Sequence, residues 1–248
     1  DLDFLTLTTT CCQIDIIKLF KDGFSTGHGF LREPNDIQSY SALACIAIQS
    51  NQNDQHGGQS IPNFDYGMAI GVAKTYSKLY TKNLAKAAEI LEEKFKEFKQ
   101  KIADETGVKP RLEASEEYCR LEAPYLAEIV GEDAVERLQK FAVKYSEKET
   151  DRATYQAMEA LVHNLNTMHS RAGAQVPFSS INYGTDTTPE GRMVIRNILL
   201  AEDAGLGNGE TPIFPIHIFK VKEGINYNEG DPNSDLFKLA CRVSPKRL

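Results

Sequence analysis

Hydrophobic residues recur at helical spacing over residues 74–104, the clearest periodic pattern in the chain. The positions are Tyr76, Tyr80, Leu84, Ala87, Leu91, Phe95, Phe98 and Ile102. Glu92 and Lys96 on the polar side form a favourable i, i+4 pair. Gly107 then supplies a typical helix end. The pattern predicts a single helix over 74–104, roughly 45 Å long, whose length suits pairing with another helix.

Other helices are predicted where periodic hydrophobic positions meet capping or helix-breaking residues. A helix over 35–50 would begin at Pro34 and Asn35, which favour a helix start. A helix from Pro189 to about Ala204 would have Thr188 as its N-cap. The remaining expected helices are an acidic stretch over 111–149, broken near Pro124 and Gly131, and a helix over 151–170 capped by Thr150.

Strands are predicted over residues 6–16, 173–184 and 211–221, which are rich in Thr, Ile, Phe and Val. The last strand is apolar on both faces, as in buried strands of α/β proteins. The polar stretches 21–30 and 50–60 are predicted to be loops. Helices between strands indicate an α/β sheet or barrel, with the helical hairpin of about 74–149 outside the sheet.

Two adjacent cysteines lie in the first predicted strand. Side chains alternate along a strand, so Cys12 would share the apolar face with Ile14, and Cys11 would lie on the polar face with Gln13. We therefore expect Cys12 to be packed and Cys11 to be the candidate for chemistry. The alternative for any buried cysteine is a small hydrophobic side chain without a chemical role.

Composition and cysteine spacing narrow the function classes. The five cysteines include no Cys-x-x-Cys pair and are odd in number, so we expect free thiols, no bound metal and a cytoplasmic protein. Cys45 and Cys241 are expected to be packed. The net charge of -7 argues against a nucleic-acid groove. The sequence contains no apolar run of membrane length and no Gly-Lys-Ser/Thr phosphate loop, and its first residues lack the basic stretch of a signal peptide, so none is expected there.

Long stretches of the sequence resemble one enzyme family. These stretches are "TTTCCQID", "GFSTGHGFLREPNDIQSYSALACIAIQSNQNDQHGGQSIPNFDYGMA", "HSRAGAQVPFSSINYGTDT" and "EGRMVIRNILLAEDAGLGNGETPIFPIHIFKVKEG". They are similar to the class III, anaerobic, ribonucleoside-triphosphate reductases. The resemblance covers essentially the whole chain and is weakest between about 85 and 145. Matches of this length are far more specific than a short motif.

This resemblance implies a ten-stranded α/β barrel of two half-barrels, with residues 1–248 as the N-terminal part. It also implies reduction of ribonucleoside triphosphates to deoxyribonucleotides with formate as the usual reductant. In this family a cysteine on a finger loop becomes a thiyl radical that takes the 3′ hydrogen, and a glycyl radical stores the radical. An iron–sulfur, S-adenosylmethionine activating enzyme installs that radical. The finger loop, the glycyl radical segment and a zinc-binding region are expected beyond Leu248, so this chain alone is expected to be inactive.

Several residues acquire expected roles by matching this family pattern. The cysteine that acts at C2′ of the substrate, on an early barrel strand, matches Cys11. The substrate-facing rim is expected to include His56, Gly57, Gly58, Gln59, Ser179, Ser180 and Asn182. No metal or cofactor is expected to bind to these residues.

The resemblance also implies a specificity site, where a deoxynucleotide or ATP effector binds at a homodimer interface. The expected residues lie around the start of the 35–50 helix: Arg32, Asn35, Asp36 and Gln38. A helix N-terminus is a suitable place for phosphate, and the 74–104 helix could complete the dimer contact. The alternative for Arg32 is a surface charge.

Two other functions remain open from the residues. One is a nucleotide-binding dimerisation module without catalysis. The other is a different glycyl radical enzyme, acting on a carbon–carbon or carbon–oxygen bond. A glycyl radical motif downstream in the same reading frame would favour a reductase over the first alternative.

Overall fold

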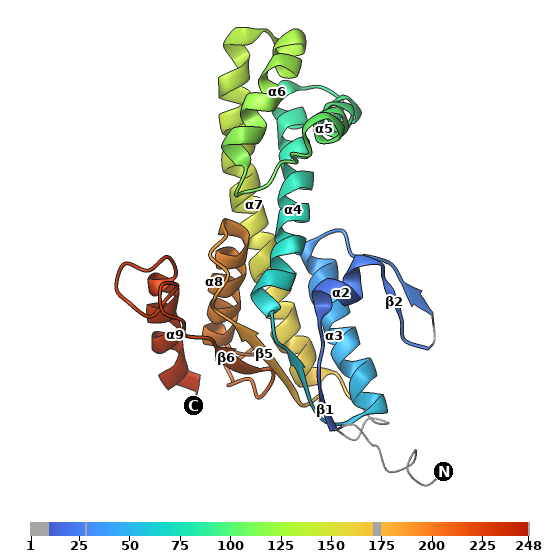
Figure 1. The fold of residues 1–248 in the computed structure, drawn as a ribbon, viewed down its shortest axis with the longest axis vertical. Coiled ribbons are helices and arrows are strands. Elements are labelled where there is room, and N and C mark those ends of the chain that lie inside the picture. The colour runs from blue at the N-terminus through green and yellow to red at the C-terminus, as the bar shows by residue number, and fades with distance from the viewer. Residues whose placement is uncertain (1–9, 28, 171–174, 248) are drawn as a thin grey trace. The chain divides into compact units, whose positions relative to one another are not determined.

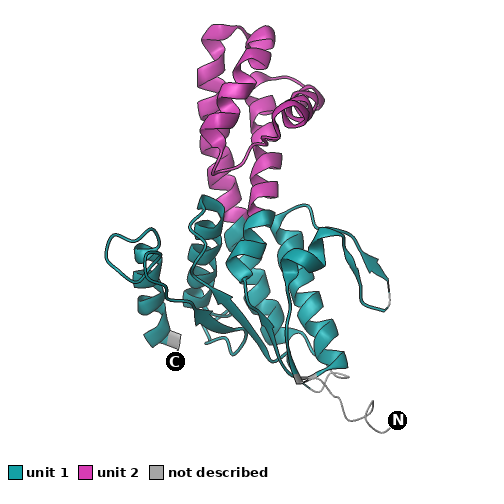
Figure 2. Cartoon of the chain, viewed as in Figure 1, with its two compact units in different colours: residues 1–71, 154–248 teal, residues 72–153 magenta. Residues whose placement is uncertain are grey.

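The computed structural model describes residues 10–27, 29–170 and 175–247, so the first part of the strand predicted over 6–16 lies outside the described residues. The chain divides into two compact units (Figures 1 and 2). Unit 1 comprises residues 1–71 and 154–248, and unit 2 comprises residues 72–153. Two helices, α4 (Phe64–Ala88) and α7 (Glu132–Thr167), contribute residues to both units.

The strands described in unit 1 form a parallel sheet in the order β1-β4-β5-β6. Their bounds are β1 Thr10–Gln13, β4 His56–Ile61, β5 Ser179–Tyr183 and β6 Ile216–Phe219. Helices connect successive strands, which parallel pairing requires. The prediction of an α/β fold with a parallel sheet is therefore confirmed at this level.

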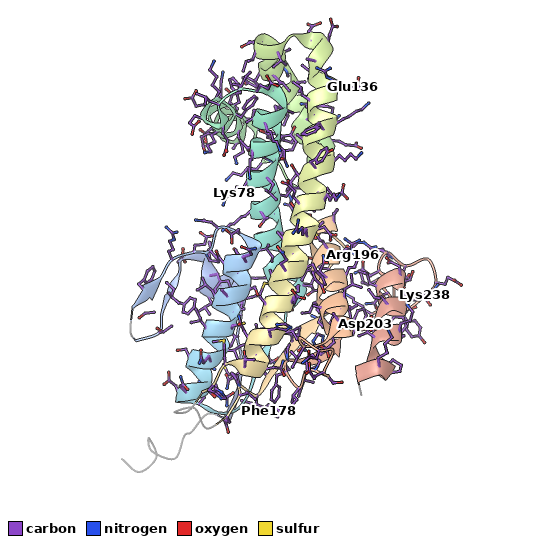
Figure 3. All side chains as sticks on the ribbon, turned by 180° about the vertical axis from the view of Figure 1, so that it is seen from behind. Lys78, Glu136, Phe178, Arg196, Asp203 and Lys238 are labelled. Carbon is purple, nitrogen blue, oxygen red and sulfur yellow. The ribbon has the colours of Figure 1, made fainter. Side chains whose placement is uncertain are left out.

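Unit 1 contains several helices: α2 (Ile16–Lys21), α3 (Ile37–Asp54), the second part of α7, α8 (Pro189–Ala204) and α9 (Ser234–Arg247). Of these, α3, the second part of α7 and α8 lie side by side over one face of this sheet (Figures 1 and 3). Ser41 Oγ of α3 donates to the Ala157 carbonyl of α7 (2.7 Å), and Thr154 Oγ1 of α7 contacts the sulfur of Met193 in α8. A short hairpin, β2 (Phe24–Ser25) and β3 (Phe30–Leu31), follows α2.

The two faces of the sheet differ in burial. Ile61, Ile181 and Tyr183 are buried on one face, whereas Ser60 and Asn182 on the other are only half-buried. Paired residues of neighbouring parallel strands point to the same face, so the half-buried face is continuous across β4 and β5. It is the polar face of the sheet.

Helix ends follow the capping rules, with one shift. Thr188 accepts a hydrogen bond from Gly191 N, and Pro189 opens α8, which confirms the predicted start. Helix α3 begins at Ile37, two residues later than predicted, and ends at Asp54 instead of about residue 50. Its N-cap is Asp36, which accepts from Ser39 N (2.8 Å), so Pro34 and Asn35 precede the cap.

Unit 2 is helical. It contains the rest of α4, α5 (Glu92–Thr106), α6 (Ser115–Val130) and the first part of α7. A buried core joins them, made of Tyr76, Tyr80, Leu84, Ala85, Phe95, Ile102, Tyr118, Leu126, Val135, Leu138 and Ala142. The hydrophobic positions predicted for the long helix are therefore largely core positions.

Several predicted boundaries were wrong. The single helix over 74–104 is two helices, because the chain turns at Glu89, which has a positive φ of 56°. The break expected near Thr150 is absent, since α7 runs continuously over residues 132–167. Pro124 lies inside α6, and only Gly131, at the end of α6, fulfils its predicted role as a break. The sequence around Thr150 contains no proline or glycine that would end a helix. The part of the predicted segment 111–149 that follows Gly131 therefore continues into the segment predicted over 151–170 as one helix, α7.

The strand predictions also need corrections. Residues 56–61 form a central strand, β4, although the stretch 50–60 was predicted to be a loop. Strand β6 was expected to be buried on both faces, but Ile216 and Ile218 are each 43% exposed, because they pair with Ser180 and Asn182 and so point to the half-buried face of the sheet. Cys241, expected to be packed, is exposed on α9, while Cys45 is buried as predicted.

Candidate functional site

Cys11 lies on a distorted part of strand β1. The β1–β4 pairing changes register between Thr10 and Cys12, and Cys11 has a positive φ of 62°. Between the paired residues on either side, one residue of β1, Cys11, faces two residues of β4, Gly57 and Gly58, so the extra residue of this bulge-like irregularity is on β4. The Cys11 thiol is exposed.

Cys12 does not occupy the packed position that strict alternation predicted. It is half-exposed, and its thiol lies near its neighbour's carbonyl, Gln13 O, at 3.7 Å. The positive φ of Cys11 interrupts the regular extended backbone on which the prediction of alternation depended. The expectation that Cys12 is packed was therefore wrong.

The nearest strand leaves room for Cys11 only because Gly57 has no side chain. Gly57 also has a positive φ, 87°. A Cβ atom on Gly57 would lie 2.8 Å from Cys11 Sγ and 2.9 Å from Cys11 N. The structure thus brings together Cys11 and one of the expected rim residues. Gly58, the next rim residue, faces the Phe178 ring instead, and Phe178 itself is labelled in Figure 3.

The other expected rim residues divide between the two faces of the sheet. Gln59 and Ser179 are fully buried on the helix-covered face. Ser180 and Asn182 are half-buried on the polar face, and Asn182 Oδ1 accepts from Ser60 Oγ (3.3 Å). The side chain of His56 lies outside the described residues. Sequence reasoning missed Ser60, because the strand that places it beside Asn182 was taken as a loop.

The expected effector residues surround the start of α3. Arg32, Asn35 and Gln38 are exposed. Asp36 uses Oδ1 to accept from both Ser39 N and Ser39 Oγ, each at 2.8 Å. This end of the helix thus already has a negatively charged cap, which a phosphate group would have to face. An effector site at these residues stays a prediction.

A cavity of about 770 Å³, lined by both apolar and polar side chains, lies between the end of β1, α2, the β2–β3 hairpin and α3. Its polar lining includes Asp15, Asp22, Asp54, Lys18 and Asn51. With three carboxyl groups and one ammonium group, the lining of this cavity favours a ligand that donates hydrogen bonds. It disfavours a phosphate group that arrives without a cation. The sequence signal for this cavity is weak, because Asp15 is also the N-cap of α2, accepting from Ile17 N and Lys18 N.

The described residues contain no cluster of three or more His, Cys, Asp or Glu side chains that could hold a metal ion. The five cysteines are free thiols. Among the helices of the described ranges, none combines the length and apolarity needed to cross a membrane.

Fold and site together define the class: an α/β protein with a parallel sheet and an exposed thiol beside a glycine on the neighbouring strand. Comparison with known proteins gives the family. The profile of anaerobic ribonucleoside-triphosphate reductases matches residues 1–248. The chain belongs to this family.

Individual relatives agree with this assignment. The chain is 28% identical to the anaerobic ribonucleoside-triphosphate reductase of Enterobacteria phage T4, over 97% of the chain and 31% of that protein. It is 33% identical to the Haemophilus influenzae protein of the same name, over 100% of the chain and 28% of that protein. The Escherichia coli K12 protein of that name is 26% identical over 96% of the chain. The chain thus spans about a quarter to a third of these relatives.

Proposed function

We propose that this chain contributes the N-terminal part of the catalytic barrel to an anaerobic ribonucleoside-triphosphate reductase. The complete protein would reduce ribonucleoside triphosphates to deoxyribonucleoside triphosphates and supply precursors for DNA. The family match over the whole chain carries this proposal. The parallel sheet supports it, as does the exposed Cys11. The helical segment of about 74–149 would be an insertion in the barrel domain.

Cys11 is the residue of this chain that we propose to act in the reaction, by taking part in reduction at C2′ of the ribose. Replacing the 2′ hydroxyl by hydrogen, with loss of water, requires two electrons and two protons. Formate, oxidised to carbon dioxide, would supply both electrons and one proton, and the solvent would supply the other proton. A glycyl radical in another segment would supply the radical chemistry. The exposed thiol of Cys11 is available to a ligand, and the polar face with Ser60, Ser180 and Asn182 offers hydrogen bonds for ribose hydroxyls.

Regulation and partners are further parts of the proposal. A deoxynucleotide or ATP would bind near Arg32, Asn35, Asp36 and Gln38 in a homodimer, and select the substrate. An iron–sulfur, S-adenosylmethionine activating enzyme would install the radical. Free thiols suit the reducing cytoplasm that we propose as the site of action.

The test compares Cys11→Ser with Cys12→Ser in the complete protein, activated without oxygen. Reduction of a ribonucleoside triphosphate with formate should fall to background in Cys11→Ser, because a hydroxyl cannot replace the redox-active thiol. Cys12→Ser, the matched control on the adjacent residue, should retain activity. Normal turnover by Cys11→Ser would reject the role of Cys11. A complete reading frame without a glycyl radical segment would instead favour a binding module without catalysis.

A further inference from the structure

The Cys11 thiol occupies space that a side chain on the next strand would need. A Cβ atom on Gly57 would be 2.8 Å from the sulfur and 2.9 Å from the backbone nitrogen of Cys11. Real Cβ atoms are not found this close to such atoms, and a backbone nitrogen cannot rotate away. Any other residue at this position would therefore displace the thiol, the strand or both.

An amide relay, partly buried and centred on the buried side chain of Gln59, holds the Gly57 backbone from the opposite side. Gln59 Nε2 donates to the Gly57 carbonyl (3.3 Å), and Asn51 Nδ2 of helix α3 donates to Gln59 Oε1. Gln59 is 0% exposed, so its side chain cannot reach a ligand on the polar face. Buried hydrogen bonds of this kind hold one arrangement, because breaking one leaves a polar group unsatisfied.

We propose that Gly57 and Gln59 are positioning residues for the Cys11 thiol. Gly57 would leave the space that the sulfur occupies, and Gln59, held by Asn51, would fix the β4 backbone that faces Cys11. This inference rests on the proposed function of Cys11. It replaces the direct substrate contact that the family resemblance suggests for these two residues.

The position of the thiol matters because transfer between the sulfur and the ribose requires close contact. Reacting atoms must come within roughly 3–3.5 Å, and a displacement of about 1 Å can cost roughly a hundredfold in rate. The positive φ of Cys11 and the bulge around it depend on β4 keeping its path. Residues that hold β4 should thus affect rate more than substrate binding.

The test uses Gly57→Ala and Gln59→Met in the complete protein. For each variant, kcat and KM for the ribonucleotide are measured together with the alkylation rate of Cys11 by iodoacetamide, in a Cys12→Ser background and read by peptide mass spectrometry. We expect kcat to fall at least about tenfold with KM nearly unchanged. The alkylation rate should change by roughly threefold or more, since reactivity depends on thiol surroundings.

Matched controls separate position from strain. Gly209→Ala imposes similar backbone strain, because Gly209 has a φ of 83°, but its Cβ would meet nothing within 4 Å. Gln49→Met removes an α3 amide that bonds the His169 carbonyl instead of the relay. Both controls should match wild type in kcat and in Cys11 alkylation.

Two results would overturn the proposal. One is a raised KM with unchanged kcat and alkylation, which would make these residues substrate contacts. The other is wild-type behaviour in both variants. If Gly57→Ala shows no thermal unfolding transition, the variant is not folded, and the results for Gln59→Met alone then test the proposal. Alkylation does not depend on turnover, so normal turnover by Cys11→Ser would reject the proposed function without deciding the positioning result.

Discussion

Each unit contains a buried carboxyl group, and the two are bound by different kinds of donor. Asp65, at the start of α4 in unit 1, is 0% exposed. Its carboxylate accepts from the backbone N–H groups of Gly184, Thr185 and Asp186 at 2.9–3.0 Å, and of Tyr66 at 3.2 Å. These donors belong to the loop after β5 and to α4 itself. Asp65 therefore fixes that loop at the carboxyl ends of β4 and β5.

Glu122, on α6 in unit 2, is 3% exposed and has side-chain donors instead. Tyr80 OH of α4 donates to Glu122 Oε2 (2.6 Å), and Gln139 Nε2 of α7 donates to the same atom (3.2 Å). Tyr118 and Cys119 are the other titratable groups of the cluster. Burial raises the pKa of Glu122 to about 7, and the hydrogen bonds from Tyr80, Gln139 and Tyr118 only partly oppose it.

The difference concerns how easily each donor set can rearrange. The backbone N–H groups of a loop can change direction only if the backbone itself moves. The hydrogen bonds between Asp65 and residues 184–186 therefore fix both the loop conformation and the Asp65 side chain. Side-chain donors can rotate, and a carboxyl group that gains a proton changes from acceptor to donor. In unit 1 the buried Asp65 thus fixes a loop, whereas in unit 2 the protonation of the buried Glu122 changes near neutral pH.

The largest effect is expected from Asp65→Ala. This change leaves backbone N–H groups of residues 184–186 buried without their acceptor, which should lower the free energy of unfolding by about 3 kcal/mol. Urea denaturation followed by circular dichroism measures it. Glu229→Ala is the control, because it removes a carboxylate from an exposed pair with Lys238. A loss equal to that of the control would show that Asp65 does not anchor the loop.

Sequence reasoning predicted the α/β class and the main helices of unit 1, because capping residues such as Thr188 and Pro189 act locally. It missed β4, because Gly57 and Gly58 have low strand propensity. That strand forms because it pairs with β1 and β5 on both sides, and its glycines permit the close approach of Cys11. Contacts between segments far apart in the chain produce no hydrophobic periodicity within the sequence of β4 itself.

The candidate site was predicted only in part. Alternation favoured Cys11 over Cys12, and Cys11 is indeed exposed, but the local geometry is irregular, with a positive φ at Cys11 and a register change opposite it on β4. Side-chain directions of Gln59 and Ser179 could not be predicted while β4 was taken as a loop. The buried polar cluster around Glu122 was missed too, since an acidic helix is expected to be solvated.

A smaller effect, and one that depends on pH, is expected at Glu122. Its folded pKa, about 7, exceeds the ordinary value of 4.5, so the folded state binds the proton more tightly. The extra stability is fully present below pH 4.5 and is lost as pH rises to about 7. The loss should be on the order of 2 kcal/mol. Hydrogen exchange of unit 2 amides at pH 5 and pH 8, corrected for the intrinsic rate, measures it.

Glu122→Gln should remove this pH dependence, because the amide does not titrate in the window. Glu117→Gln, on the exposed side of the same helix, is the matched control and should keep the wild-type dependence. If wild type and Glu122→Gln lose protection equally between the two pH values, Glu122 is not the group responsible. The contrast between the two buried acids would then need another explanation.

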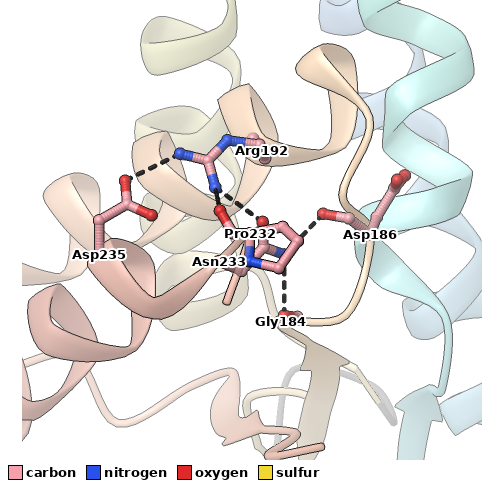
Figure 4. A network of polar contacts seen from close by, with 6 residues as sticks. All are labelled: Gly184, Asp186, Arg192, Pro232, Asn233 and Asp235. Carbon is pink, nitrogen blue, oxygen red and sulfur yellow. Dashed lines mark hydrogen bonds and ion pairs between the residues drawn. The ribbon is translucent and has the colours of Figure 1, made fainter. Parts of the chain in front are cut away.

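The smallest effect is expected at Arg192 of α8, whose guanidinium joins three acceptors near the start of α9 (Figure 4). It donates to the Pro232 carbonyl, to Asn233 Oδ1 (2.7 Å) and to Asp235 Oδ2 (2.8 Å). The Asp235 side chain is 63% exposed, so this ion pair itself should contribute little. Arg192→Lys keeps the charge but loses the planar fork, and should cost about 1 kcal/mol of unfolding free energy.

Asp235→Ala removes only the exposed partner of Arg192 and should cost less than about 0.5 kcal/mol. Urea denaturation of both variants beside wild type gives the two values. If the fork matters because it holds the Pro232 carbonyl and Asn233, the first loss should exceed the second, and only Arg192→Lys should increase hydrogen exchange around Asn233. Asn233 also donates to the carbonyls of Gly184 and Asp186, so this exchange reports on the loop that Asp65 fixes. Equal losses would mean that the ion pair with Asp235 accounts for the stabilising effect of Arg192. Fixing of polar side chains by backbone groups would then not be a general feature of unit 1.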